Sequence, residues 1–296
     1  MQIAAHVLAY NVNRFIEPVI RNLSPHVDKV YIAHSDKPWG YVESSRLNAV
    51  NPTTLSSLKD IALKNSKVEI ICGDWVTEED MRNDCLSRAR NEGFDWLIVQ
   101  DADEFYTDQA WNNIKKTLLS NKSDNSLKTT WYNFWKSSDF VLVYPNDSIK
   151  HTNASFAIRC SSDEHFMRKR LPFGDTKVID CACYHYGYVM SDEEMFDKIS
   201  TWGHANELFS NKWYVHKWLN WSEKTKNLHP ILPASWQKAI RFPLEQPEFA
   251  LQFSVPLTND KILNFGNLIG NEYYDAKVNL NSVKNYTKNV VKSILK

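Results

Sequence analysis

The segment from Trp96 to Phe105 constrains the fold more than any other part of this sequence. Its four leading apolar residues, Trp96 to Val99, predict a strand buried on both faces, as in the middle of a parallel sheet. Three carboxylates follow within four residues: Asp101, Asp103 and Glu104. Buried together they would repel one another, and a divalent metal would relieve that repulsion. The alternative is a solvated acidic turn after a core strand.

Strands and helices alternate before this segment. The apolar patterns predict strands at 3–10, 29–35 and 68–72, and helices at 14–27, 53–65 and 77–92. Such alternation is the signature of βαβ units and of a parallel sheet. After a helix at 108–120, the pattern predicts strands with shorter links at 129–135, 140–144, 154–160 and 177–188. The predicted fold class is α/β, with a Rossmann-like, mostly parallel central sheet flanked by helices.

Several common phosphate-binding and hydrolytic motifs are missing from the sequence. Its eight glycines form neither Gly-x-Gly-x-x-Gly nor a P-loop, and no Gly-x-Ser-x-Gly is present. A protein that binds phosphate without a glycine loop usually needs a cation, which again indicates Asp101 and Asp103. Lysine plus arginine equal aspartate plus glutamate, 35 against 35, so charge gives no reason to expect nucleic acid as a partner.

Cysteine usage and the N-terminal segment bear on the compartment. The five cysteines are odd in number and lack framework spacing, which favours a reducing environment. The apolar run from Ile3 to Ala9 is too short for a signal peptide core or a membrane span. We expect a soluble, cytoplasmic protein without a transmembrane segment. Membrane-surface association through a basic amphipathic helix at 281–296 is the less favoured alternative to docking of that helix on the core.

A set of motifs in residues 1–110 carries a family resemblance. In chain order these are Tyr10-Asn11, Asp36, Asp74, Arg82-Asn83, Ala89-Arg90 and Ile98-Val99-Gln100-Asp101-Ala102-Asp103-Glu104. This order resembles the inverting, family 2-like glycosyltransferases with the GT-A fold. The segment Tyr184 to Val189, with a capped helix containing Met195 and Lys198, looks like one found in bacterial and viral enzymes of that group.

The resemblance implies a metal-dependent enzyme that moves a sugar from a UDP- or GDP-sugar to a glycan or glycoconjugate acceptor. It implies that Asp103 binds Mn²⁺ or Mg²⁺, and that Asp101 binds the metal or the ribose. The other implied nucleotide-binding residues are Asn11, Asp36, Asp74 and Arg82. The metal would neutralise the charge that develops on the leaving diphosphate. Ordinary loop acids and helix-surface charges are the alternatives for Asp36, Asp74 and Arg82.

His185 is the expected third metal ligand, since imidazole suits Mn²⁺. Cys181, Cys183 and His185 alternate on one strand, so a zinc site is a second possibility, although plain buried cysteines are favoured over it. An inverting transfer needs a general base, and Glu164 leads a group that also contains Asp163, Asp175 and Asp192. A solvated loop acid is the alternative for Glu164, and a retaining mechanism is the alternative for the enzyme.

The predicted organisation is a GT-A domain at 1–208, with a nucleotide-binding half at 1–107 and an acceptor half at 108–208. A helical extension at 209–296 would pack on it. Four tryptophans could floor an acceptor site, although core packing is the favoured role: Trp202, Trp213, Trp218 and Trp221. Two other functions are alternatives to a glycosyltransferase. A sugar-phosphate nucleotidyltransferase should carry glycines where Tyr10 to Asn13 stand, and a non-catalytic carbohydrate-binding protein would need no metal or nucleotide.

Overall fold

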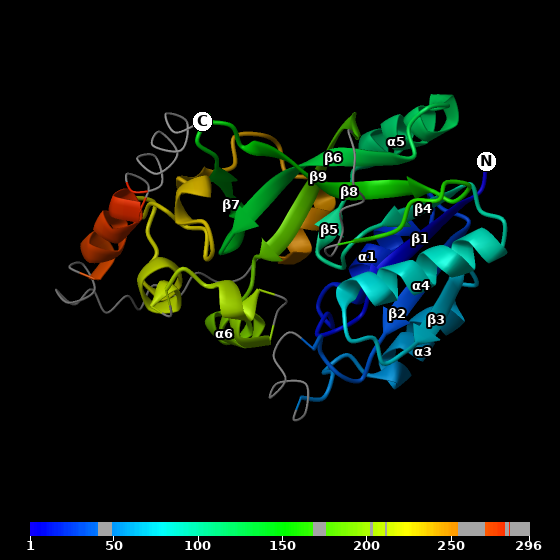
Figure 1. The fold of residues 1–296 in the computed structure, drawn as a ribbon, viewed down its shortest axis with the longest axis horizontal. Helices are drawn as coiled ribbons and strands as arrows, with labels where there is room; N and C mark the ends of the chain where they lie inside the picture. Colours follow the sequence, from blue (N-terminus) through cyan, green and yellow to red (C-terminus); the bar gives the residue numbers. More distant parts are fainter. Residues whose placement is uncertain are drawn as a thin grey trace, which may run out of the picture.

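The computed structural model describes residues 1–40, 49–167, 176–201, 204–210, 212–253, 270–281 and 284. Its centre is a mixed sheet, to which the described residues contribute ten strands (Figure 1). Four of these are parallel and adjacent in the order β3-β2-β1-β4: β1 (Ile3–Leu8), β2 (Lys29–His34), β3 (Val68–Cys72) and β4 (Trp96–Val99). The predicted α/β class with a parallel core is confirmed.

Helices cover both faces of this parallel part, and each face has its own core. On β1, Ile3, Ala5 and Val7 face one core, whereas Ala4 faces the other. The first core also holds apolar residues of α1 (Ile16–Leu23), α3 (Leu55–Lys64) and α5 (Asp108–Ser120). The second core holds the buried face of α4 (Glu78–Asn91). β4 is apolar throughout because it contributes to both cores: Trp96 and Ile98 face the first, and Leu97 and Val99 face the second.

Local signals fix where the helices begin and end. Thr77 caps α4 by accepting a hydrogen bond from the Asp80 amide at 3.1 Å. At the other end, Gly93 adopts a left-handed backbone with φ of 81°, and the Phe94 amide reaches back to the Ala89 carbonyl at 3.0 Å. This turn directs the chain into β4. The capping box predicted at Ser191 is confirmed, because Ser191 and Glu194 exchange two hydrogen bonds at the start of α6 (Asp192–Thr201).

The second half of the chain extends the sheet with mainly antiparallel strands. These are β6 (Ser126–Trp135), β7 (Ser137–Val143), β8 (Lys150–Arg159) and β10 (Lys238–Arg241), with β8 beside β4. The long strand β9 (Lys177–Tyr188) pairs parallel with β6 and antiparallel with β5 (Glu104–Phe105). Neither β5 nor β10 was predicted. β10 lies within residues 209–296, for which a helical extension was predicted, and it pairs antiparallel with β7.

Residues after α6 form short turns of helix around a separate aromatic core at the far end of β7 and β9 (Figure 1). Tyr214–Leu219 is a π-helix where an ordinary helix was predicted, and residues 270–281 are helical. Trp213, Trp218 and Trp221 are buried in this core, while Trp202 lies outside the described residues. Apart from its first residue and residue 284, the helix predicted at 281–296 also lies outside them. The domain division at 208 stays a prediction.

No helix within the described ranges combines the length and the apolar character that crossing a membrane would require.

Candidate active site

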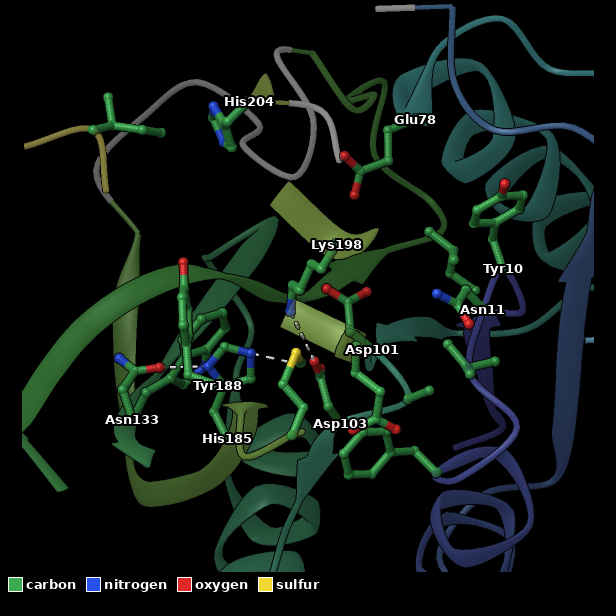
Figure 2. A pocket seen from close by; sticks show the side chains of 18 of the residues that line it. Tyr10, Asn11, Glu78, Asp101, Asp103, Asn133, His185, Tyr188, Lys198 and His204 are labelled. Carbon is green, nitrogen blue, oxygen red and sulfur yellow. Dashed lines mark hydrogen bonds and ion pairs between the residues drawn. The ribbon is translucent and has the colours of Figure 1, made fainter. Parts of the chain in front are cut away.

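A cavity of about 930 Å³ opens at the carboxyl ends of β1 and β4, the edge at which open α/β sheets bind ligands. Both halves of the chain line it. Its floor is formed by the segments that follow β1 and β4, and its opposite wall by β6, β9 and the residues after α6. Figure 2 shows Tyr10 and Asn11 on one side and Asn133, His185 and Tyr188 on the other, with Asp101 and Asp103 between them.

The loop after β1 is held by a buried amide from a distant segment. Asn51 donates to the carbonyls of Ala9 and Ser35, at 2.7 Å and 2.8 Å, and its oxygen accepts from the Asn11 amide at 3.0 Å. The next amide, that of Val12, donates to the Thr53 hydroxyl at 2.8 Å. These bonds fix the left-handed backbone of Asn11, whose φ is 52°. They also leave the Asn11 and Val12 amides already bound, so these two amides are not available to a phosphate.

Asp101 lies beside a buried guanidinium. The Arg82 side chain is 1% exposed, and its Nη2 contacts Glu78 Oε1 at 2.6 Å and Asp101 Oδ1 at 3.2 Å. Its Nη1 contacts His6 Nε2 at 3.2 Å. Arg82 therefore anchors two carboxylates at the cavity wall. The structure thus brings Arg82 and Asp101 together at the predicted nucleotide side of the site.

Asp103 meets His185 through the short pairing of β5 with β9. The Tyr186 amide donates to the Asp103 carbonyl at 2.8 Å, and Glu104 pairs with His185 in the next register position. As a result His185 Nε2 lies 3.5 Å from Asp103 Oδ1, and Lys198 Nζ lies 3.8 Å from Asp103 Oδ2 (Figure 2). Two cationic or potentially cationic groups therefore share one carboxylate.

Asn133, on the side opposite Asp103, and Trp131 orient the imidazole of His185. Its Nδ1 hydrogen-bonds to Asn133 Oδ1, and the Asn133 amide donates to the Tyr144 hydroxyl oxygen at 2.5 Å. The Trp131 ring packs against it with centroids 4.5 Å apart. With Nδ1 donating its proton to Asn133, Nε2 is the nitrogen that faces Asp103. A polar partner that orients one ring nitrogen, with the other nitrogen directed towards a carboxylate, is an arrangement in which histidine can ligate a metal.

The charge on Asp103 follows from its neighbours. Burial raises the pKa of this carboxyl, but the charge and hydrogen bond of His185 and the charge of Lys198 outweigh burial, and the pKa is lowered overall. Asp103 is therefore ionised at neutral pH. Gly187 allows the imidazole and the carboxylate to lie this close to the strand, because a Cβ at this position would be only 2.6 Å from His185 Nε2 and 3.0 Å from Asp103 Oδ2.

Asp103 and His185 fit a metal that brings part of its own coordination shell. In the described parts of the chain, no three His, Cys, Asp or Glu side chains converge closely enough to enclose an ion. Asp101, which the resemblance implied would bind the metal or the ribose, is turned towards Arg82. One carboxylate and one imidazole suffice for Mg²⁺ or Mn²⁺ when phosphate oxygens and water complete the shell. For Cys181, burial raises the thiol pKa to about 12, and Cys183 lies in the core, as expected for plain buried cysteines.

Three predicted site residues do not line the cavity: Asp36, Asp74 and Glu164. Asp36 is 90% exposed at the end of β2, and Asp74 is exposed after β3. Glu164 lies in the loop after β8, where Arg90 Nη2 binds its backbone carbonyl at 2.5 Å. Their predicted roles stay predictions. The carboxylates that do line the cavity are Glu78, Asp101, Asp103, Glu194 and Glu207.

Sequence reasoning missed Glu78, Asn133 and Tyr144, and gave Lys198 no role. Glu78 could have been found, because it stands four residues before Arg82 on a predicted helix, at the spacing of an ion pair. Asn133 and Tyr144 carry no such signal, since they reach the site only through the pairing of β6, β7 and β9.

Comparison with known proteins gives a fold likeness only. No family model matches the chain, and no curated protein matches it. Among solved structures, it is similar to 4-diphosphocytidyl-2C-methyl-D-erythritol synthase from Anaerococcus prevotii, with 14% identity over 66% of this chain and 93% of that one, and a TM-score of 0.41. For S. aureus TarS residues 1–349 in complex with UDP, the identity is 13% over 74% and 71%, with a TM-score of 0.38.

A third similar structure is the mannosyltransferase PcManGT from Pyrobaculum calidifontis in complex with GDP-Man and Mn²⁺. Its identity is 16% over 43% of this chain and 35% of that one, and the TM-score is 0.33. The predicted likeness to glycosyltransferases is found, together with a likeness to a synthase of another kind. All three TM-scores lie below 0.5. The functional argument therefore rests on the geometry of the cavity itself.

Proposed function

We propose that this protein is a metal-dependent glycosyltransferase, which moves a sugar from a nucleoside diphosphate sugar to a saccharide acceptor. The observation that carries the proposal is the pair of Asp103 and His185 in the cavity, with an ionised carboxylate and an oriented imidazole that both lie close to the side-chain-free backbone of Gly187. A nucleotide sugar needs a cation on its diphosphate as the sugar leaves, and this pair is where the chain could hold one.

Each residue has a distinct part in this proposal. Asp103 and His185 Nε2 would hold Mn²⁺ or Mg²⁺, which supplies positive charge to the leaving diphosphate. Lys198 lies on the same side of the carboxylate and would donate a hydrogen bond to a phosphate oxygen once the donor is bound. Asp101, oriented by Arg82, would accept from the ribose hydroxyls. The loop at Asn11 would bound the nucleoside side of the site.

The loop after β1 favours this function over nucleotidyl transfer. A nucleotidyltransferase of this sheet type would be expected to bind phosphate with free amides at that loop. Here the Asn11 and Val12 amides bind Asn51 and Thr53 instead. A non-catalytic carbohydrate-binding protein would have no need of the ion group around Asp103.

Calorimetric titration with UDP and with GDP, each with Mn²⁺ and with chelator, tests the proposal. We expect nucleotide binding that requires Mn²⁺ and is lost in Asp103→Asn by more than the about 10- to 100-fold that removing an outer partner of a metal ligand costs. Asp60→Asn, at an exposed position of α3, is the matched control and should bind normally. Equal binding in chelator would remove the metal from the proposal, and absence of nucleotide binding under both conditions would refute it.

A further inference from the structure

The cavity has a second end, away from Asp103, that is lined mainly by neutral polar groups and aromatic rings, beside the pair of His204 and Glu207, whose Nδ1 and Oε2 lie 2.9 Å apart. His151 comes from β8, Tyr144 follows β7, and His229, Ser235 and Trp236 come from the segment before β10. Among the described lining residues the lysine and arginine side chains are Arg14, Arg82 and Lys198, and each is paired with a carboxylate. This second end therefore offers hydrogen bonds and ring faces rather than positive charge.

The proton on His229 can be placed from its contacts. Its Nδ1 accepts from the amides of Ile231 and Leu232, at 3.1 Å and 3.0 Å, so the neutral ring carries its proton on Nε2. The ring packs against Trp236 with centroids 4.2 Å apart. Burial, aided by the charges of His204 and His151, lowers the pKa of His229 to about 4. At neutral pH the ring is uncharged and its Nε2–H is a donor.

Two polar atoms of this end lack a partner in the described structure although they are buried. One is His151 Nδ1, whose ring stacks on Tyr144 with centroids 4.5 Å apart. The other is Ser235 Oγ. Burial also lowers the pKa of His151, so this imidazole is neutral too. A buried polar atom without a partner is unfavourable, and because both residues line the cavity, a ligand that supplies hydroxyl groups could satisfy them.

Tyr144 connects this end to the proposed metal pair. Its hydroxyl oxygen accepts from Asn133, which orients His185, and its side chain also hydrogen-bonds to Trp236. Tyr188 packs edge-on against the same Trp236 ring, with centroids 4.9 Å apart. A ligand at His151 and Ser235 would therefore lie along the same wall as the reacting sugar.

We propose that His151, His229, Ser235 and Trp236 form a subsite for an uncharged, hydroxyl-rich saccharide. The Nε2–H of His229 can donate to a hydroxyl group and His151 Nδ1 can pair with another, and an indole face suits the apolar face of a sugar ring. A sugar phosphate or a uronic acid would instead find no unpaired cation among the described residues of this subsite. Naming this saccharide the acceptor rests on the proposed glycosyl transfer, whereas its binding does not.

Binding is measured without any nucleotide, by titrating the protein with neutral disaccharides such as lactose, maltose and cellobiose, and with glucose 6-phosphate and glucuronic acid. Tryptophan fluorescence follows binding, because Trp236 is part of the subsite. We expect at least one neutral disaccharide to bind and the two anionic sugars to bind more weakly. Preferential binding of an anionic sugar, or no binding of any disaccharide, would overturn the proposal.

Two variants remove hydrogen bonds to the ligand while sparing the fold. Ser235→Ala deletes a hydroxyl that has no partner in the described structure, so it should not destabilise the protein. His229→Asn keeps an acceptor where Nδ1 meets the amides of Ile231 and Leu232, but lacks the Nε2–H. We expect each to weaken disaccharide binding about 2- to 10-fold, the range for one lost neutral hydrogen bond. Tyr274→Phe is the matched control. It also deletes a buried hydroxyl that has no partner in the described structure, but Tyr274 does not line the cavity.

The nucleotide titration separates the two proposals. If the subsite variants lose disaccharide affinity and keep Mn²⁺-dependent UDP or GDP binding, both proposals stand. If disaccharides bind as expected and no nucleotide does, the subsite stands and glycosyl transfer fails. Unchanged disaccharide affinity in both Ser235→Ala and His229→Asn would refute the subsite, whatever the nucleotide result.

Discussion

Gly187→Ala tests the proposed metal pair with one methyl group. The added Cβ would lie 2.6 Å from His185 Nε2, whereas ordinary contact begins near 3.4 Å. The imidazole, the Asp103 carboxylate or the strand must therefore move by the difference between 3.4 and 2.6, about 0.8 Å in all. The backbone at Gly187 is not left-handed, so alanine itself is tolerated there. The substitution should therefore displace the His185 and Asp103 side chains, without imposing an unfavourable backbone conformation on β9.

The expected effects on stability and on binding differ in size. Overpacking of this kind costs about 1–3 kcal/mol of unfolding free energy. Misplacing a functional group by about 1 Å can cost about 100-fold in rate, and we expect a loss of that order in Mn²⁺-dependent sugar transfer, with weaker nucleotide binding. Urea unfolding measures the first quantity; calorimetry and donor turnover measure the second.

Gly93→Ala is the matched control. Gly93 ends α4 with a φ of 81°, and no atom of the residues that the structure describes lies within 4 Å of its added Cβ. Alanine there should cost about 1–2 kcal/mol from the left-handed backbone alone, without touching the cavity. If Gly187→Ala bound UDP and Mn²⁺ like the unaltered protein, while Gly93→Ala showed its expected loss of stability, Asp103 and His185 would not form the metal site.

Three other predictions concern stability. Arg82→Met leaves Glu78 and Asp101 without their buried cation, and should cost about 3–5 kcal/mol in urea unfolding; a loss below about 1 kcal/mol would mean that the carboxylates find solvent. Asn51→Ala removes the amide that fixes the loop after β1, and should accelerate hydrogen exchange at the Asn11 and Val12 amides, which unchanged exchange would contradict. His229 has a folded pKa of about 4 against an ordinary value of 6.5, so its contribution is intact above pH 6.5 and is lost as the pH falls towards 4, by up to about 3 kcal/mol. Urea midpoints at pH 7 and pH 4.5 should therefore separate less in His229→Asn than in the unaltered protein, and equal separation would be the contrary result.

The first half of the fold was predictable because each of its elements carries its own signal. β4 is an uninterrupted apolar run, and α4 has a threonine cap and a glycine stop. The short strands β5 and β10 carry no such signal, since two and four residues are too few for a periodic pattern. They exist because β9 and β7 offer them an edge, which is a property of the tertiary structure.

The candidate site likewise has residues that the sequence predicted and residues that only the tertiary structure brings together. Asp101, Asp103 and Arg82 were predicted from motif order, and the structure places them at one cavity. The pairing of Asp103 with His185 depends on the register of β5 against β9, and the tryptophans of the cavity are Trp131 and Trp236 rather than those singled out in the sequence. In contrast, Trp213, Trp218 and Trp221 lie in the core, because the turns after α6 bury them against β7 and β9.

The two-residue strand β5 has a consequence for how the protein is made. It joins Asp103, at the end of the first half, to His185, which the ribosome adds much later, and Lys198 follows later still. A nascent chain that has folded its parallel strands already presents Asp101 and Arg82, but it has only one side of the metal pair. Under the proposed function, metal-dependent nucleotide binding would begin only when β9 has docked, and an incomplete chain would not hold the metal-bound donor.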